Sequence, residues 1–183
     1  DKLIKNSKIA FLEGYVWEED LAKESLVKAA EIARNAGNKV ALTLSDPFCV
    51  EKHRNEFKDL IKNNIDILFA NEFEAKELCQ TKDLEESAKE ISSMTEIVAI
   101  TRSENGAKIY NSNETVEIKA KVFNVVKDTT GAGDLFAAGF LYGLINKFSI
   151  LKSGKIASIT AGEIISHFGA RPETNLADLI QKK

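Results

Sequence analysis

The sequence predicts an α/β fold, in which a mostly parallel sheet is flanked by helices. Short apolar segments alternate with longer amphipathic ones, and a hairpin pattern is found only in the second half of the chain. Such alternation is typical of βαβ units, whose helices cover the sheet. The chain has 183 residues without an internal repeat, a low-complexity tract or a linker, so we expect residues 1–183 to form part of one domain.

The first part of the chain is predicted to alternate strands with helices. Asn35-Ala36-Gly37 is a signal for the C-terminus of a helix, and Asp46-Pro47 ends an apolar strand. The expected strands are 8–14, 39–44, 65–69 and 97–100, and the expected helices are 18–36, about 50–64, roughly 72–79 and 83–92.

The second part begins with a different pattern. Residues 106–110 and 115–119 flank a polar segment at 111–114, which indicates an antiparallel hairpin. A short strand at 122–127 is expected to lead into a glycine turn. The remaining residues predict helices at about 132–147, 149–168 and 175–182.

Composition and charge exclude several functional classes. Apolar residues make up 44% and charged residues 29%, as in ordinary globular proteins. A net charge of −3 and a pI near 5.6 argue against a nucleic-acid or anionic-membrane partner. No apolar run spans a bilayer, and the N-terminus lacks both a signal-peptide core and an initial Met, so we expect a fragment.

The cysteines and histidines suggest no metal centre. Cys49 and Cys79 have neither metal-ligand nor disulfide-framework spacing, and we interpret them as idle thiols in a reducing cytoplasm. His53 is expected on a helix surface. His167 is expected to be a hydrogen-bonded structural residue.

The glycine turn Asp128-Thr129-Thr130-Gly131-Ala132-Gly133-Asp134 is the strongest functional signal. Gly131 and Gly133 allow close backbone approach, and the free amides at the start of the next helix attract an anion. Asp134 is placed to accept a proton from an attacking hydroxyl. The Walker motif is absent, and Phe136 breaks the dinucleotide pattern. A plain N-capped helix is the alternative.

This turn resembles the C-terminal signature of the PfkB (ribokinase-like) family of sugar and nucleoside kinases. The resemblance implies a ribokinase-like three-layer α/β/α fold. It also implies that Asp134 is the catalytic base and that the amides of Gly131, Ala132 and Gly133 form an anion hole. Asp128 and Thr130 match the family's positions beside a monovalent cation such as K⁺.

Asn71-Glu72-Phe73-Glu74 matches a second family motif, Asn-x-x-Glu. The resemblance implies that Asn71 helps to bind ATP and that Glu74 organises Mg²⁺ through water, which suits a cation that keeps its water ligands. The alternative for this pair is a helix-capping box.

Thr101-Arg102-Ser103-Glu104-Asn105-Gly106 resembles the family's Thr-x-Gly-x-x-Gly turn, with Ser103 in place of the first glycine. Thr101 and Gly106 are the predicted nucleotide contacts, and an ordinary turn into the hairpin is the alternative. Residues 157–172 resemble the helix and loop that close over the purine and the cation.

The resemblance implies a small-molecule substrate. The segments 42–48 and 66–72 resemble the adenosine kinase branch, which implies a nucleoside acceptor; a ribokinase- or fructokinase-type sugar kinase is the alternative within the family. The N-terminal strands, the lid and the acceptor-binding residues of the family have no match here. Two further hypotheses are a non-catalytic nucleotide-binding or structural fragment and a Rossmann dehydrogenase, which the broken glycine pattern disfavours. The resemblance also leads us to expect a homodimer for the full-length protein.

Overall fold

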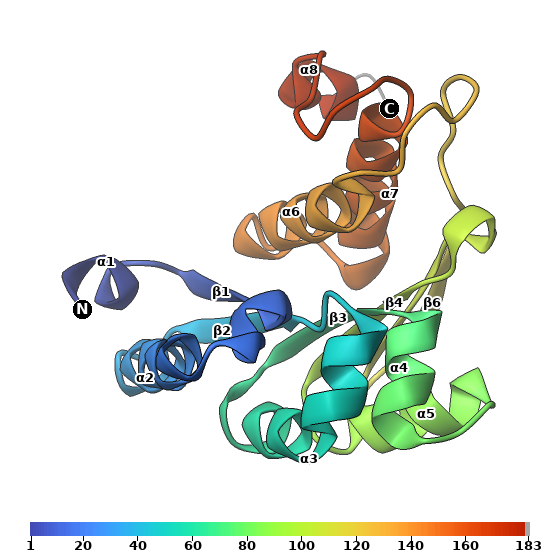
Figure 1. Cartoon of the computed structure of the whole chain (residues 1–183). Helices are drawn as coiled ribbons and strands as arrows, with labels where there is room; N and C mark the ends of the chain where they lie inside the picture. Colours follow the sequence, from blue (N-terminus) through green and yellow to red (C-terminus); the bar gives the residue numbers. More distant parts are fainter. Residues whose placement is uncertain (182–183) are drawn as a thin grey trace. The chain divides into compact units, whose positions relative to one another are not determined.

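The computed structural model describes residues 1–181, and its strands form one mostly parallel sheet (Figure 1). The strand order is the sequence order, β1 to β6. β1 pairs with β2 in parallel, with Ile9 opposite Lys39, and β2 pairs with β3 in parallel, with Ala41 opposite Ile67. The strands are β1 Ile9–Glu13, β2 Lys39–Thr43, β3 Ile67–Asn71, β4 Ile97–Thr101, β5 Ala107–Asn111 and β6 Thr115–Ile118.

Helices fill the connections between the parallel strands and follow the hairpin. The α-helices are α1 Lys2–Lys5, α2 Asp20–Asn35, α3 Pro47–Asn64, α4 Glu72–Cys79, α5 Leu84–Ser92, α6 Ala132–Ile145, α7 Ile150–Ile164 and α8 Leu176–Gln181. Short 3₁₀ helices are η1 Gly14–Glu18 and η2 Ser103–Asn105. The predicted fold class is therefore confirmed: a mostly parallel sheet flanked by helices.

Several predicted boundaries differ from the structure. Residues 122–127 form no strand, so that prediction is wrong. Val122, Val125 and Val126 are exposed, and the backbone N–H of Lys127 donates to the carbonyl of Ile165 in α7 rather than to a strand. The predicted helix 149–168 ends at Ile164, while residue 182 of the last predicted helix lies outside the described residues.

Helix α3 begins earlier than predicted because its N-terminus is well capped. The Asp46 carboxylate accepts hydrogen bonds from the backbone amides of Phe48 and Cys49, and Pro47 occupies the first turn. His53 of the same helix is buried, so its predicted surface position is wrong. It lies at a kink in α3 and contacts the side chains of Lys23 and Glu56.

The chain divides into two compact units, each described separately. Unit 1 is Asp1–Ile100 with Tyr110–Glu114, and unit 2 is Thr101–Ile109 with the described residues from Thr115 onward. Among residues 1–181, no helix combines the length and apolarity needed to cross a bilayer.

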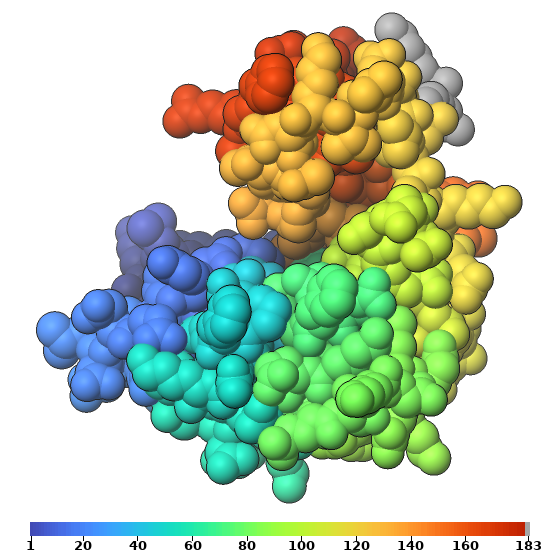
Figure 2. All heavy atoms as spheres, turned by 45° about the vertical axis from the view of Figure 1, so that its right-hand side comes forward, coloured from blue at the N-terminus to red at the C-terminus, as the bar shows by residue number. Residues whose placement is uncertain are grey.

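Unit 1 has a continuous apolar core. Alternate strand residues such as Val40, Leu42 and Leu68 pack with Phe57 and Ile61 of α3, because successive strand side chains point to opposite faces. Helices α2, α3, α4 and α5 lie beside these strands (Figure 1), and atoms of α3, α4 and α5 form one continuous surface in Figure 2. This core fixes the carboxyl ends of β1, β2 and β3.

Unit 2 is built around the pair of helices α6 and α7. A Cβ on Gly139 would lie 2.4 Å from Oγ1 of Thr160, so the two helices approach more closely than larger residues would permit. Phe140 is fully buried in this unit. The close packing holds the N-terminus of α6, where the glycine turn ends.

Candidate active site

The glycine turn leads directly into α6. Gly131 is the residue before this helix and has φ +81°, a left-handed conformation that favours glycine. Its α-carbon also faces Ala170, which a Cβ would contact at 3.4 Å. Gly133 lies within the first helical turn, and a Cβ there would meet open space, so a ligand can approach its backbone. Gly131 therefore suits the left-handed turn and its packing on Ala170, whereas Gly133 leaves room for a ligand.

The amides of this turn are not equally available. The N–H of Ala132 donates to the carbonyl of Thr129 at 3.1 Å, whereas within residues 1–181 no hydrogen bond engages the N–H of Gly133 or Asp134. These open donors lie at the positive end of the α6 dipole. An anion at the helix terminus would therefore be bound by the amides of Gly133 and Asp134 before that of Ala132.

The Asp134 side chain lies in the first turn of α6 and is exposed. Its carboxylate makes no hydrogen bond or ion pair with any other described residue. A general base must reach the proton that it removes, so an accessible and unengaged carboxylate suits that role.

A cavity of about 410 Å³ adjoins the glycine turn and lies wholly within unit 2. We call it the glycine-turn cavity. It brings together four of the predicted site residues, Thr101, Gly106, Ala132 and Gly133. Its volume lies in the range of small-molecule sites. Apolar wall residues, including the buried Phe136, suit the flat face of a nucleobase, whereas the helix terminus suits its phosphates.

The turn at Ser103–Gly106 forms one wall of this cavity. The N–H of Arg102 donates to the carbonyl of Gly106 at 2.7 Å, and the N–H of Gly106 donates to that of Ser103 at 3.0 Å. Gly106 has φ +79°, and a Cβ would approach the carbonyl oxygen of Ile118 to 1.9 Å. Ser103, at the family's glycine position, has φ +50°. The left-handed turn is therefore retained with a serine.

Asp128 ties the glycine turn to the loop after α7. Its Oδ1 accepts hydrogen bonds from the backbone N–H of Thr130 at 2.9 Å and its hydroxyl at 2.7 Å. Its Oδ2 accepts one from the N–H of Gly169 at 3.0 Å. These hydrogen bonds, first that of the Thr130 amide, lower the pKa of Asp128 to about 2. The carboxylate is therefore ionised at neutral pH and suits a nearby cation.

The sequence analysis missed Glu163, which holds the loop after α7. Its carboxylate is only 3% exposed, and Oε1 accepts hydrogen bonds from the amides of Glu173 and Thr174, both at 2.9 Å. Nε2 of His167 lies 3.4 Å from the same oxygen. Glu163 thereby anchors the segment that carries Gly169. An acidic residue in the apolar stretch 161–165 was the available signal.

Asn71 and Glu74 belong to unit 1, where they form a complete capping box at the start of α4. Oδ1 of Asn71 accepts from the N–H of Glu74 at 2.9 Å, and Oε2 of Glu74 accepts from the N–H of Asn71 at 2.8 Å. Oε1 of Glu74 also accepts from the Asn71 side-chain amide at 2.6 Å. Capping is therefore one role of this pair.

Glu74 has an unusual electrostatic environment. Its side chain is buried, and burial raises its pKa to about 7, with further contributions from the charges of Asp46 and Glu13. A nearby cation would relieve this repulsion between carboxylates. Among the described residues, no group of three or more His, Cys, Asp or Glu side chains is arranged to hold a metal directly. The residues therefore fit a hydrated Mg²⁺ better than a directly chelated one.

Comparison with known proteins shows to which family the chain belongs. The pfkB family carbohydrate kinases match residues 1–176. A probable sugar kinase from Rhizobium etli has a TM-score of 0.95 at 42% identity, covering 98% of this chain and 55% of that one. Adenosine kinase from Sinorhizobium meliloti has a TM-score of 0.96 at 38% identity, covering 99% and 56%.

Curated relatives agree with the structural comparison. Ribokinase from Lactococcus lactis is 31% identical over 172 residues, which cover 92% of this chain and 51% of that protein. The chain therefore spans about half the length of such relatives. Because the match extends over nearly all of this sequence, the chain belongs to the pfkB family of carbohydrate kinases.

Proposed function

We propose that this chain is the nucleotide-binding and catalytic part of a kinase that transfers the γ-phosphate of ATP to a hydroxyl of a nucleoside or sugar. The observation that carries the proposal is the glycine-turn cavity. It places predicted nucleotide contacts, Thr101 and Gly106, beside the open amides of the α6 N-terminus. Asp134 lies in the first turn of the same helix.

The nucleotide would bind with its base against the apolar wall and its phosphates toward the start of α6. The amides of Gly133 and Asp134 would stabilise negative charge as it develops on the transferred phosphoryl group. Support for ATP also comes from the fold: a putative ribokinase II from E. coli, 17% identical to this chain, was solved with ATP and Mg²⁺.

In the proposed reaction, the acceptor oxygen bonds to the γ-phosphorus while the bond to the β,γ-bridging oxygen breaks. ADP leaves with the bonding electrons, and the carboxylate of Asp134 takes the hydroxyl proton. Mg²⁺, when bound, would neutralise phosphate charge. Glu74 and Asn71 are the residues that would hold its water ligands. Asp128 and Thr130 would lie beside a monovalent cation such as K⁺, and the ionised state of Asp128 supports this assignment.

We favour a nucleoside acceptor over a sugar. The resemblance of the segments 42–48 and 66–72 to the adenosine kinase branch supports this choice. In addition, Phe48 in the first turn of α3 is 80% exposed at the carboxyl end of β2, and an exposed phenyl ring offers a stacking surface for a base. A cytoplasmic location, supported by the free thiols of Cys49 and Cys79, and a homodimer of the full-length protein remain predictions.

The test is phosphorylation of adenosine, ribose and fructose with ATP and Mg²⁺, measured on the full-length protein and on Asp134→Asn. Asn keeps the shape of the side chain but accepts no proton, so we expect kcat to fall by about 10³-fold or more. Asp178→Asn, an exposed acid of α8 in the same unit, is the matched control and should retain full activity. Activity of Asp134→Asn equal to that of the unmodified protein would contradict the assignment of the base.

The second candidate is a nucleotide-binding fragment without catalytic activity. The chain's coverage of only about half of its relatives motivates it. Calorimetry with Mg-ATP on the chain 1–183 separates the two. Binding without phosphorylation of any acceptor supports the fragment, whereas turnover by this chain excludes it.

A further inference from the structure

A second cavity of unit 2 lies apart from the predicted site residues. It has a volume of about 480 Å³ and is formed by the end of β6, α7 and Ile180 of α8. Four lysines line it: Lys119, Lys121, Lys152 and Lys155. We call it the lysine cavity. A concentration of positive charge at one cavity contrasts with the net charge of −3 of the whole chain.

The charges of the lysine cavity are not compensated by acidic neighbours. Within residues 1–181, no carboxylate lies within 4.0 Å of these four ammonium groups, and the one acidic lining residue, Glu117, pairs with Lys108 at 3.9 Å. Lys152 instead lies over the ring of Phe148, with Nζ 3.6 Å from the ring centre. Such a contact orients an ammonium group without neutralising it. The four ammonium groups repel one another. A bound anion would reduce this repulsion and would be attracted by all four ammonium groups.

The cavity wall is apolar and well packed. Ile159 and Ile180 are partly exposed and supply the accessible apolar surface, whereas Ile118 and Ile156 are each 3% exposed. A bare inorganic ion would leave that surface in contact with water. An anion that carries a short hydrocarbon portion would bury it, which adds about 25 cal/mol per Å² of apolar surface. The volume is also typical of sites for small organic ligands.

The backbone between the two cavities is rigidly held. Oγ of Ser158, a buried residue, donates to the carbonyl of Lys119 at 2.8 Å and accepts from the N–H of Lys121 at 2.9 Å. A Cβ on Gly162 would lie only 2.1 Å from the carbonyl oxygen of Lys121, so this segment lies directly on α7. Lys121 lines both the lysine cavity and the glycine-turn cavity.

We propose that the lysine cavity is a binding site for a small organic anion, a carboxylate or phosphate on an apolar body, and that its occupancy is coupled to the glycine-turn cavity through residues 119–121. The ammonium groups hold the anionic head, and the isoleucines contact the apolar part. An anion that fixes the side chain of Lys121, which lines both cavities, lowers the entropy lost when the neighbouring cavity is filled.

The first experiment is a titration of the isotopically labelled full-length protein with hexanoate, followed by NMR. We expect saturable shifts at the amides of residues 118–121 and 155–159, and affinity reduced about fivefold by 0.5 M NaCl because exposed charges are screened. Hexanol, which has the same chain without the charge, should give no saturable shift. Shifts that do not saturate, or that hexanol reproduces, would overturn the proposal.

Lysine-to-alanine variants show whether hexanoate binds in the lysine cavity. Lys152→Ala with Lys155→Ala should weaken hexanoate binding by about tenfold, since two partly solvated charges are lost. Lys147→Ala, which removes a lysine outside the cavity, is the control and should bind hexanoate normally. Both lysines are exposed, and the same spectra report whether the variant remains folded. Equal affinity in the double variant and the control would place the ligand elsewhere and refute the site.

The coupling is measured separately, and it rests on the proposed function. Saturating hexanoate should make ATP bind about two- to threefold more tightly, and the double variant should lose this effect. Hexanoate binding with unchanged ATP affinity refutes the coupling alone. Hexanoate binding in a protein that binds no ATP refutes the nucleotide assignment but leaves the anion site in place.

Discussion

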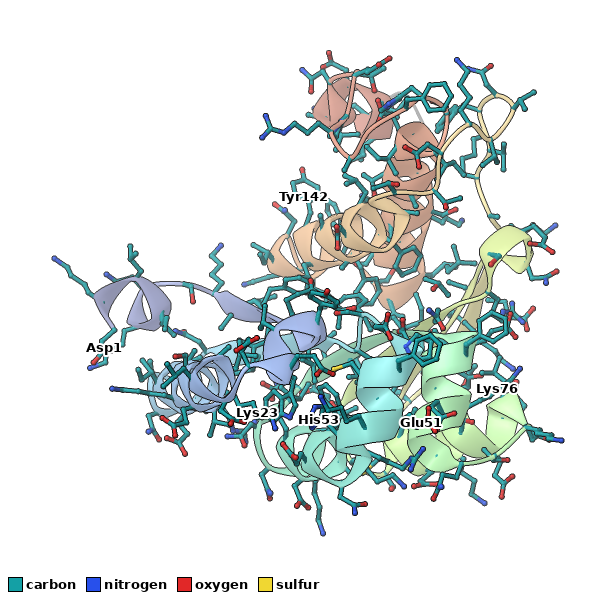
Figure 3. The ribbon with its side chains drawn as sticks, in the orientation of Figure 1. Asp1, Lys23, Glu51, His53, Lys76 and Tyr142 are labelled. Carbon is teal, nitrogen blue, oxygen red and sulfur yellow. The ribbon has the colours of Figure 1, made fainter. Side chains whose placement is uncertain are left out.

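Units 1 and 2 differ in how their charged side chains are paired with opposite charges. In unit 1, several cationic side chains pair with carboxylates: Lys23 with Glu56 at 3.0 Å, Lys39 with Asp66 at 3.3 Å, and Arg54 with Glu77. The hydrogen bond from Lys23 is the main reason that the pKa of Glu56 falls to about 2. Figure 3 shows Lys23 and His53 close together in this network.

Unit 2 leaves several of its polar groups open. The carboxylate of Asp134, the amides at the start of α6 and the ammonium groups of the lysine cavity have no charged partner among the described residues. Ion pairs at a surface contribute little to stability, so their absence in unit 2 costs the fold little. We infer that the charged and polar groups of unit 2 are available to ligands, whereas many of those in unit 1 hold its elements together.

Each unit contains one buried carboxylate that departs from the pattern of its unit, and these two residues test the comparison. In unit 2, Glu163 is buried and its Oε1 is fully engaged. In unit 1, Glu74 is buried with a pKa raised to about 7. If the comparison is right, Glu163 should matter for the order of its loop, and Glu74 should reduce the stability of its unit at high pH.

The largest expected effect is that of Glu163→Ala. It removes the acceptor of two amides and leaves His167 without its buried partner, so the free energy of unfolding should fall by about 4 kcal/mol. Glu163→Gln keeps an acceptor oxygen and should recover more than half of the loss. Urea unfolding measures the stability, and hydrogen exchange at the amides of Glu173 and Thr174 shows whether the loop is released.

The control for this prediction is Glu173→Ala, which alters an exposed side chain of the same loop. Its stability should stay within about 0.5 kcal/mol of the unmodified protein. If Glu163→Ala were equally harmless, the loop would be held by contacts other than this carboxylate.

The next largest effect is the pH dependence of stability that the ionisation of Glu74 causes. A carboxyl group whose pKa rises on folding, from 4.5 to about 7, favours the folded state most below pH 4.5, where it is protonated in both states. This contribution is lost as the pH rises from 4.5 through 7 and amounts to about 3 kcal/mol. The difference in stability between Glu74→Gln and the unmodified protein should therefore shift in favour of the variant between pH 4 and pH 8.

Thermal unfolding from pH 4 to pH 8 checks this prediction, with Glu72→Gln as the control because Glu72 pairs with Lys76 in the same helix. Gln is accepted at the third position of a capping box, so the helix start should survive the substitution. Parallel stability curves for Glu74→Gln and the unmodified protein would show that Glu74 titrates normally in the folded chain.

The sequence predicted the fold through local signals, and it failed where tertiary contacts decide. The alternating strands and helices followed from apolar periodicity, and the α4 cap from Asn71 and Glu74. The prediction of a strand at 122–127 was wrong. Its three valines favour a strand locally, but they are exposed and pair with no neighbouring strand. The lysine cavity could not be predicted, since residues 117–121 are distant in the sequence from α7 and α8, whereas Glu163 gave a local signal, an acid in an apolar stretch.

The smallest effect concerns Ser103, where the chain departs from the family's glycine. At φ +50° a serine is strained by its Cβ, typically by about 1 kcal/mol. Ser103→Gly should relieve this strain, although the greater freedom of glycine in the unfolded chain reduces the net gain to about 0.5 kcal/mol. Ser103→Ala keeps the Cβ and should give no gain. Careful denaturation curves distinguish the two variants. A loss of stability in Ser103→Gly would mean that the serine hydroxyl, rather than the backbone conformation, determines its contribution to this turn of unit 2.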